Sequence, residues 1–582
     1  MKMTRTLSIA SVLLVATGLA LSGCTSKPAP GTTTTTTAPV ATTTTTSAAQ
    51  PPTTSTTAPA PPTSNTPVLS FGKPDGPQTN NSNPWVGSSA ARTMGYAFAI
   101  YEPLVQANTL DPTAKPTPWL ATDFAWNADY TSITYTIRDG VKWSDGQAFS
   151  ADDVVYSVQQ RIDKKALNAE NLDYKAVSAS GNKVTIDFNT PQFVNQNKVY
   201  GLFMVPKHIW SAIADPTTDT NQKPVGTGPY VLDNWTAQAV ILKANPTYWG
   251  GAPSVPTIQY QEFNDNTGLT NALVAGQVQW GWSFIANYKT VWVAKDPAYK
   301  AWYPSGLGID ALWYNTVQGP FADKALRVAA TMVIDRGALS VGGSTGAAAP
   351  LTSVTGLPLP VGQSFIPAAY QGKEYATDLE GAKKVLTDAG YTGVGTALKD
   401  RQGKAVSVKI TDPAGWNDYN AEQQIIADAW KALGIDAQVD TPTADAWFTN
   451  IAEGNFDAAI HWTDGGSTPY DIYSDMMNGT YVVPVGQSAN YNFGRYQNDA
   501  VTKALADYAA ATADAARGAA LTTIIDALIA DAPTAPLLTR PSWGNYSTKY
   551  YTGWPSADDP YSDINMTLPA ASLILTKLKA VA

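Results

Sequence analysis

The 582-residue chain is predicted to have an α/β fold. From Val68 onward, segments with the two-residue period of strands alternate with segments that have the period of helices. No internal repeat is detectable in this part of the sequence. Residues 405–440 carry the pattern of one strand–helix–strand crossover, which belongs to a parallel sheet. The length is sufficient for about three domains of roughly 150 residues each.

The composition favours uncharged, hydrogen-bonding side chains over ionic ones. Charged residues make up 15% of the chain, below the roughly 25% of an average soluble protein. With 38 Lys and Arg against 47 Asp and Glu, an extended nucleic-acid-binding face is not expected. One Cys and two His argue against a Cys-based zinc site or a His-rich metal site. We therefore expect no metal, no cofactor and no nucleic-acid partner.

Residues 1–23 have the layout of a bacterial secretory signal. Lys2 and Arg5 precede an apolar run over residues 7–21 that is too short to span a bilayer comfortably. The run ends in Leu-Ser-Gly-Cys24, which resembles the lipobox of lipoproteins, where the Cys is diacylated and becomes the first residue. The alternative is an ordinary signal peptide with a chance Cys. We expect lipidation at Cys24 and anchoring at the outer face of the cytoplasmic membrane, because two acyl chains attach stably.

Residues 24–67 are predicted to be a disordered linker behind the lipidated Cys. Residues 27–67 contain 17 Thr, nine Pro and no aromatic side chain, so they cannot build a core. Proline biases such a segment toward extended geometry, which makes it a semi-stiff tether whose Thr hydroxyls are candidates for sugars. Thr/Pro linkers also join the domains of secreted polysaccharide hydrolases. The linker alone therefore does not separate a tethered binding protein from a tethered enzyme.

The first strong element is a predicted hairpin over residues 131–143. Alternating apolar residues over 131–138 are followed by a turn at Asp139-Gly140 and by the apolar segment 141–143. A helix is predicted to begin at Ser150, because a hydroxyl N-cap and two early acidic residues precede an apolar face.

A Trp-rich strand end is predicted next, over residues 276–284. Trp280, Trp282 and Phe284 lie on one side of this strand. A second such strand end, within residues 458–470, contains Trp462 and Asp464. Aromatic faces beside carboxylates and amides suit a neutral oligomeric ligand. The alternative for each Trp alone is packing in the core.

The crossover over residues 405–440 supplies the main site candidate. The strand around Val408 is followed by a helix with Asn420 as the predicted cap and Gly434 as its end, and then by a second strand. Ligands of open α/β sheets bind beyond the carboxyl ends of the strands. The loop at that end contains Trp416 and Asn417, which we take as ligand-binding candidates. Packing of Trp416 under its own loop is the alternative.

Signatures of catalysis are absent from the sequence. It contains no GxSxG, HExxH or P-loop motif, and Gly226-Thr227-Gly228-Pro229 does not fit a dinucleotide loop. His208 is expected to cap or pack, and His461 could point into a cleft or away from it. A pair of acids for glycoside hydrolysis is always possible among 47, but nothing singles one out. A secreted glycoside hydrolase therefore stays as the alternative function.

Nine motifs occur in order along residues 68–582. They are Asn-Pro-Trp at 83–85, Tyr-Glu-Pro-Leu at 101–104, Trp-Leu-Ala at 119–121, Arg-Asp-Gly-Val-Lys-Trp-Ser-Asp-Gly at 138–146, Phe-Ser-Ala-Asp-Asp-Val at 149–154, Gly-Thr-Gly-Pro-Tyr at 226–230, Asn-Pro-Thr-Tyr-Trp at 245–249, Tyr-Asn-Thr at 314–316 and Ala-Leu-Arg-Val-Ala at 325–329. This series resembles the extracytoplasmic solute-binding proteins of family 5, the dipeptide, oligopeptide, nickel and cello-oligosaccharide receptors of ABC importers. From the first motif we add Asn83 and Trp85 to the ligand-binding candidates.

The resemblance implies a two-lobed periplasmic-binding-protein fold of type II, cluster C, with an extra subdomain in the first lobe. The expected boundaries are lobe I at 68–315, with the subdomain at about 104–200, lobe II at 316–535, and a return to lobe I at 536–582. The two chain crossings are expected near 308–320 and 532–541.

The resemblance also implies roles for single residues. Peptide-binding relatives pair the ligand amino group with an Asp, and Asp464 stands at the matching position. Gly465-Gly466 departs from the pattern of those relatives, and the nearest Arg for a peptide carboxylate is Arg495. Cello-oligosaccharide-binding relatives line the cleft with Trp and Asn.

The expected function is that of a non-enzymatic, substrate-binding lipoprotein of an ABC importer. It would capture a peptide or an oligosaccharide between its lobes and deliver it to a membrane permease with its ATPase subunits. The sequence does not choose between the two ligand classes, and a monomer is expected.

Overall fold

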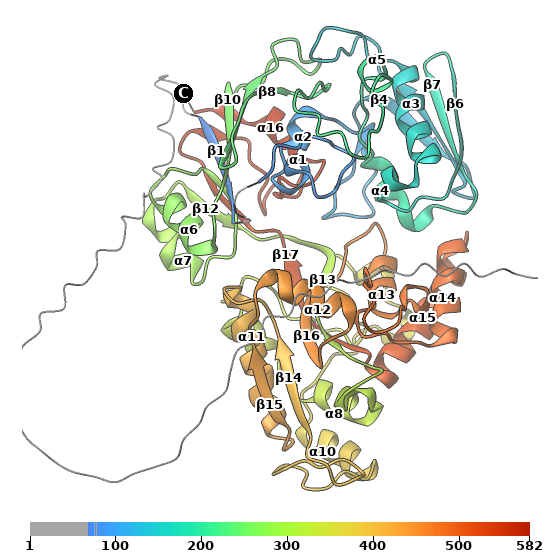
Figure 1. Cartoon of the computed structure of the whole chain (residues 1–582), viewed down its shortest axis with the longest axis vertical. Coiled ribbons are helices and arrows are strands. Elements are labelled where there is room, and N and C mark those ends of the chain that lie inside the picture. The colour runs from blue at the N-terminus through green and yellow to red at the C-terminus, as the bar shows by residue number, and fades with distance from the viewer. Residues whose placement is uncertain (1–67, 75, 77, 582) are drawn as a thin grey trace, which may run out of the picture. The chain divides into compact units, whose positions relative to one another are not determined.

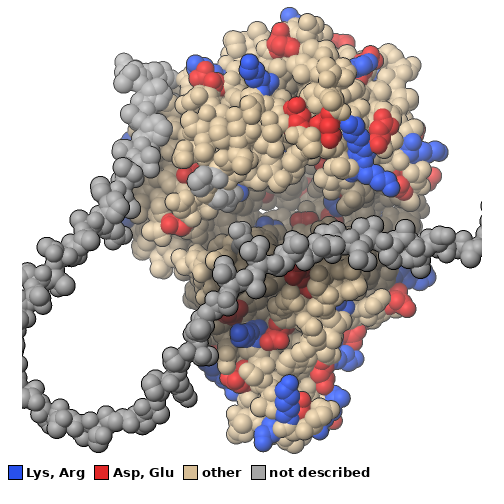
Figure 2. Space-filling model, in the orientation of Figure 1, with Lys and Arg blue, Asp and Glu red and all other residues tan. Residues whose placement is uncertain are grey.

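The computed structural model describes residues 68–74, 76 and 78–581 (Figure 1). The predicted signal peptide 1–23, Cys24 and the linker up to residue 67 lie outside the described residues. None of the described helices has the length and apolar character that crossing a bilayer requires. Figure 2 shows basic and acidic side chains as scattered patches on a surface made mostly of other residues, as the 15% charged content leads one to expect.

The first sheet has the strand order β12-β18-β11-β1-β10-β9-β8. Its strands are β1 (Leu69–Lys73), β8 (Tyr230–Trp235), β9 (Ala239–Ala244), β10 (Thr257–Glu262), β11 (Trp280–Trp282), β12 (Tyr299–Trp302) and β18 (Gly544–Ser547). β1 runs parallel to both of its neighbours, and the other pairs are antiparallel. The helices of this part are α1 (Ala90–Thr93), α2 (Ala97–Ile100), α6 (Asn266–Val274), α7 (Tyr288–Val291) and α16 (Ala571–Lys577). An aromatic-rich core packs against the sheet.

A smaller antiparallel sheet with the order β4-β5-β7-β6 forms a subdomain of its own. Its elements are β4 (Ala121–Trp126), β5 (Ser132–Ile137), β6 (Tyr174–Ser180), β7 (Lys183–Phe188), α3 (Ala151–Asp163) and α4 (Gln196–Tyr200). The short helix α5 (Lys207–Trp210) follows, and its Trp210 packs in the core of the first sheet. Short strand pairs elsewhere are β2 (Val105–Gln106) with β3 (Thr117–Pro118), and β19 (Tyr551–Thr552) with β20 (Lys579–Ala580).

The predicted hairpin is half right. The strand at 132–137 exists, but its partners are β4 and β7 rather than residues 141–143. Trp143 is fully buried in the subdomain core, and its own segment turns back on itself through the bridge between Lys142 and Ala148. The helix start is confirmed: α3 begins after Ser150, whose backbone N–H donates to the Asp153 carboxylate at 2.9 Å.

The third sheet has the order β15-β14-β16-β13-β17. Its strands are β13 (Ser305–Tyr314), β14 (Ser407–Thr411), β15 (Asp436–Asp440), β16 (Ala458–Trp462) and β17 (Thr534–Pro541). Its helices are α8 (Lys324–Met332), α9 (Arg336–Gly342), α10 (Leu379–Asp388), α11 (Asn417–Lys431), α12 (Ala444–Glu453), α13 (Tyr470–Met477), α14 (Asp499–Ala510) and α15 (Asp514–Asp531).

Strand β13 shows why this sheet is covered on both faces. Ile309, Ala311 and Trp313 point to a core shared with α12 to α15, while Leu312 and Tyr314 point to a core shared with α8 to α11. Successive side chains of a strand alternate between faces, so a continuous apolar run needs cover on each side.

The predicted crossover over residues 405–440 is confirmed. β14 and β15 are parallel neighbours and α11 connects them. The predicted cap is wrong by four residues: α11 begins after Trp416, and Asn420 lies inside the helix, where its amide donates to the Pro413 carbonyl. That bond gives Asn420 a local partner without a capping role. Gly434 ends the segment with a left-handed backbone, φ +85°.

Two short connections join the first and third sheets. Residues 303–304 lie between β12 and β13, and residues 542–543 lie between β17 and β18. Trp302 pairs with Gly544 in one sheet and Ser305 pairs with Pro541 in the other. The Ser542 N–H donates to the Pro304 carbonyl at 2.7 Å, so the two connections run side by side.

Candidate ligand-binding pocket

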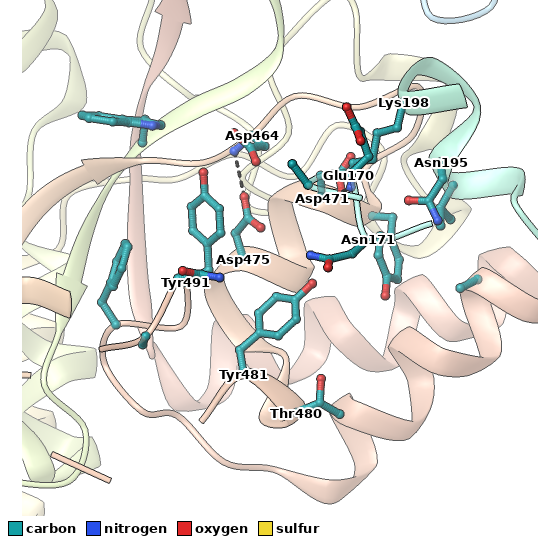
Figure 3. Close-up of a pocket in the computed structure, with 18 of the residues that line it drawn as sticks. Glu170, Asn171, Asn195, Lys198, Asp464, Asp471, Asp475, Thr480, Tyr481 and Tyr491 are labelled. Atoms are coloured by element: carbon teal, nitrogen blue, oxygen red, sulfur yellow. Dashed lines mark hydrogen bonds and ion pairs between the residues drawn. The ribbon is translucent and has the colours of Figure 1, made fainter. Parts of the chain in front are cut away.

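A cavity of about 1130 Å³ lies between two parts of the chain that are distant in sequence. One wall comes from residues 169–171 and 190–198, which flank the small antiparallel sheet. The other comes from residues 448–510, which include the end of β16 and helices α12, α13 and α14. Figure 3 shows polar side chains of both walls lying near one another. The volume exceeds the roughly 1,000 Å³ that bounds most small-molecule sites, so an oligomer fits it.

A salt bridge connects the two walls. The Lys198 ammonium on α4 lies 3.1 Å from the Asp471 carboxylate on α13. Burial alone would lower the pKa of Lys198, but the charge and hydrogen bond of Asp471 more than offset this and raise it. Lys198 therefore stays protonated at neutral pH.

Two further carboxylates lie on the wall that follows β16. The Asp464 backbone N–H donates to the buried Asp475 carboxylate at 2.7 Å, the contact drawn as a dashed line in Figure 3. Burial raises the pKa of Asp475, and the nearby charges of Asp464 and Asp471 raise it further. The Tyr491 ring lies beside this pair, and its hydroxyl bonds with Asp464.

Aromatic packing holds Trp462 at the edge of the cavity. His461 stacks on Trp462 at 4.0 Å between ring centroids, and the Arg540 guanidinium lies over the indole at 4.6 Å. Protein groups therefore already stack on this indole. Trp416 is 6.1 Å from Trp462 between centroids and also contacts Trp447, but it is not among the residues that line the cavity. Trp416 thus supports the wall from behind.

His461 faces the cavity side of the sheet. Strand alternation in β16 puts Ala459 and His461 on the face covered by α12 to α15, and His461 is buried there. Burial lowers the pKa of His461 to about 3. The imidazole is therefore neutral at physiological pH and contributes no charge to the pocket.

The remaining candidates lie elsewhere. Trp280 and Trp85 belong to the core of the first sheet, and Trp282 packs against that core. Phe284 is buried against Trp543. Asn83 is buried and binds backbone groups, because its amide donates to the Pro216 and Asp219 carbonyls and its oxygen accepts from the Trp85 N–H. Asn417 is exposed at the first turn of α11.

The glycines at 465 and 466 allow the loop after β16 to pack closely. A Cβ at Gly465 would lie 2.7 Å from the Gly308 nitrogen on β13. A Cβ at Gly466 would collide with the Asp471 carboxylate. Larger residues at these two positions would therefore push the loop away from β13 and α13.

Arg495 is committed to the fold. It is buried, and its guanidinium donates to the carbonyls of Phe493 and Ala452 at 2.6 Å and of Gln487 at 2.9 Å.

The pocket residues that sequence reasoning missed are Lys198, Asp471, Asp475 and Tyr491, together with Arg540 behind Trp462. Asp471 and Asp475 lie four residues apart in one helix, a spacing that puts both on one face and could have identified them.

The described part of the chain contains no group of three or more His, Cys, Asp or Glu side chains arranged to hold a metal ion. The pocket chemistry thus comes from carboxylates, one ammonium group, tyrosine hydroxyls and aromatic rings.

Comparisons with known proteins agree with this architecture. Over 469 residues the chain is 26% identical to the periplasmic murein peptide-binding protein MppA of Escherichia coli, covering 75% of this chain and 82% of that protein. A periplasmic oligopeptide-binding protein of Thermotoga maritima has a similar structure, with a TM-score of 0.80 and 23% identity over 88% of this chain and 99% of that one. Its mannohexaose-bound structure gives a TM-score of 0.76 at 22% identity, over 89% and 99% of the two chains.

These structural matches confirm the predicted α/β fold of the cluster C type. Residues 115–483 match the bacterial extracellular solute-binding proteins, family 5 Middle, and this match spans more than half of the chain. Proteins of this family are transport receptors and not enzymes, so the hydrolase alternative is set aside. The chain belongs to the bacterial extracellular solute-binding proteins of family 5.

Proposed function

We propose that this chain is the substrate-binding lipoprotein of an ABC importer and that it binds a peptide or an oligosaccharide in the pocket described above. The observation that carries the proposal is a cavity of about 1130 Å³ whose two walls come from residues 169–198 and 448–510, in a protein of a solute-binding family. The Escherichia coli relative is named for a murein peptide, and the Thermotoga maritima structure is named for bound mannohexaose. Both ligand classes therefore belong in the test.

The proposed mechanism is closure around the ligand. Lobe I would comprise residues 68–302 and 544–582, lobe II would comprise residues 305–541, and the connections at 303–304 and 542–543 would carry the hinge. The boundaries expected from the sequence, at 315 and 535, would thus move to the two ends of the third sheet's segment. A ligand that contacts both walls stabilises the closed form, because only that form offers both sets of contacts. The closed complex would then dock on a permease and its ATPase subunits, and the receptor itself would act as a monomer.

We propose Trp462 and Asp464 as ligand contacts, together with Asp475 and Tyr491. They border the same cavity. The other sequence candidates, including Trp416 and Asn417, would act on binding only through the residues that they support.

We further propose that Cys24 is diacylated. The lipid would hold the receptor at the outer face of the cytoplasmic membrane, and the Thr/Pro segment would raise its effective concentration near the permease. Replacement of Cys24 by Ser should release the chain from the membrane fraction into the soluble fraction. Retention of the Cys24→Ser chain in membranes would contradict the anchor.

The ligand is found by thermal shift of the full chain, purified in detergent, against short peptides and against cello-, xylo- and manno-oligosaccharides. A binder raises the melting temperature by mass action. At a ligand concentration about 100 times the dissociation constant, the gain is about 2.7 kcal/mol. No shift with any member of either panel would contradict the proposed function.

A further inference from the structure

A short segment beside the subdomain packs into the opposite wall of the pocket. It is the 3₁₀ helix η2 (Phe193–Asn195), which directly precedes α4. Val194 is 3% exposed, because it is buried in the core cluster that contains Trp447 and Ile451 of α12. Phe193 packs against the same cluster. A segment from one side of the pocket therefore completes the core of the other side.

Arg517 in the first turn of α15 holds the ring of Phe193. Its guanidinium carbon lies 3.8 Å from the centroid of that ring. The same guanidinium donates to the Ala511 carbonyl and to the Asp514 carboxylate, each at 2.6 Å, so its position is fixed by its own wall. The Arg517 side chain is only 11% exposed. A guanidinium that is shielded from water attracts an aromatic face more strongly than an exposed one does.

Tyr130 fixes Phe193 from the side of the subdomain. The two rings meet edge to face at 5.2 Å between centroids, and the Tyr130 carbonyl accepts from the Gln192 N–H at 2.8 Å. The backbone of Tyr130 has φ +56°, in the left-handed region. Bulky residues are uncommon there, and such a conformation persists only where the surrounding contacts impose it. The subdomain thus presents Phe193 to Arg517 on a fixed support.

These contacts lie away from the two connections between the sheets. Figure 1 shows α4 and α14 at the right of the view, whereas β12 and β17, which flank the connections, lie toward its left and centre. The salt bridge from Lys198 to Asp471 lies on the same side as η2, since α4 follows η2 directly. All of these contacts join protein to protein, so they can form whatever the pocket contains. They must break before the walls can separate.

We propose that η2 is a latch: Phe193 and Val194 dock on α12 and on Arg517 of α15, and they hold the walls together independently of the ligand. This inference rests on the proposed function, in which the walls separate to admit a ligand. The receptor would then be mainly closed before capture, and a ligand would enter during brief openings. Weakening the latch should therefore favour the open form.

The test is a distance measurement between two spin labels by pulsed electron paramagnetic resonance, on the full chain with no added ligand. The labels are attached to Ala176→Cys on β6 and to Ala500→Cys on α14, two exposed positions outside the pocket lining and the latch. Cys24→Ser removes the one native Cys, so only these two sites carry labels. The ratio of short to long distances gives the ratio of closed to open forms.

Two substitutions weaken the latch in different ways. Phe193→Leu removes the ring and keeps an apolar side chain, whereas Arg517→Met removes the guanidinium and keeps an unbranched one. Arg401→Met is the matched control. The Arg401 guanidinium also donates to one carbonyl, that of Ala389, and to one carboxylate, that of Asp323, but all three residues lie within the proposed lobe II. Circular dichroism of each variant checks that it is folded.

The chain with the labels alone should show mainly the short distance. Phe193→Leu and Arg517→Met should each lower the ratio of closed to open forms about fivefold, as expected for the loss of a partly shielded contact between a cation and an aromatic ring. The double variant should fall no further than the weaker single variant, because both changes remove the same contact. Arg401→Met should leave the ratio unchanged.

An unchanged ratio in Phe193→Leu or in Arg517→Met would overturn the latch, and so would an equal fall in Arg401→Met. Effects that add in the double variant would show that the two residues act separately, which would also overturn it. The same holds if the chain with the labels alone shows mainly the long distance. Each of these results would leave the proposed function standing, because capture requires two walls but no latch, and the thermal-shift panel tests it separately.

Discussion

Removing the salt bridge between the pocket walls should loosen the closed form of the empty receptor. Lys198 and Asp471 lie 3.1 Å apart, so at an effective dielectric constant of about 20 their direct attraction is about 5 kcal/mol. The Lys198 side chain is 37% exposed. Screening by water and the ordering of a long side chain reduce the net value to about 1 kcal/mol. This corresponds to about a fivefold change in the equilibrium between open and closed forms.

The assay uses a cysteine at Val194, which is buried at the contact between the walls. Val194 comes from the subdomain side yet packs in the core cluster that contains Trp447 and Ile451 of α12. A bulky thiol reagent should reach a Val194→Cys side chain only when the walls separate. Lys198→Met should therefore raise its labelling rate about fivefold, measured against the background of the chain without the reporter cysteine.

The matched control is Lys207→Met. Lys207 pairs with Asp152 at 3.2 Å, but neither residue lines the pocket and both belong to the proposed lobe I. Its removal should leave the labelling rate unchanged. A double-mutant cycle with Asp471→Asn should return a coupling of about 1 kcal/mol for the pair. An unchanged rate in Lys198→Met, or an equal increase in Lys207→Met, would refute the role of this pair in closure.

Three further predictions follow from the same structure. Trp462→Ala should weaken ligand binding about tenfold or more, and Trp416→Ala should weaken it less because Trp416 acts only through its packing. If calorimetry finds the larger loss of affinity in Trp416→Ala, the site assignment is contradicted. Burial raises the pKa of Asp310 to about 7, so protonation of this group stabilises the folded state fully below the unfolded pKa of about 4, and that contribution is lost as the pH rises through 7. The free energy of unfolding, measured with urea, should therefore fall between pH 5 and pH 8, and it should fall by less in Asp310→Asn. A free energy of unfolding that does not change over this pH range would contradict the prediction. Gly465→Ala should displace the loop after β16 from Gly308 and reduce ligand affinity severalfold, measured in the same titration, whereas unchanged affinity would show that this close approach is dispensable.

Local patterns could be predicted from the sequence because their causes are local. The crossover over residues 405–440 has its strands, helix and glycine stop within one continuous stretch, and the structure matches it. The start of α3 at Ser150 depends on a cap and an acid three residues later. The error at Asn420 arose because the amide has another local partner, the Pro413 carbonyl, that the pattern does not reveal.

The pocket could be predicted only in part because its walls meet through distant contacts. Trp462 and Asp464 follow a strand end, a location that the sequence pattern indicates. Lys198 and Asp471 are 273 positions apart, and no periodicity links them. Trp280 and Trp85 look like site residues because they are large aromatics near turns, yet the core of the first sheet needs aromatic side chains as well.

The paired connections at 303–304 and 542–543 restrict how one half of the receptor can move against the other. Each connection is flanked by ladder pairs on both sides, and the bond from Ser542 to Pro304 ties the two together. A ribbon of two bonded strands bends more easily across its plane than it shears along its length. The motion should therefore be a hinge rotation about a single axis that passes through the two connections. The distance between two fluorescent dyes, one on each wall of the pocket, should then decrease when the receptor captures its ligand.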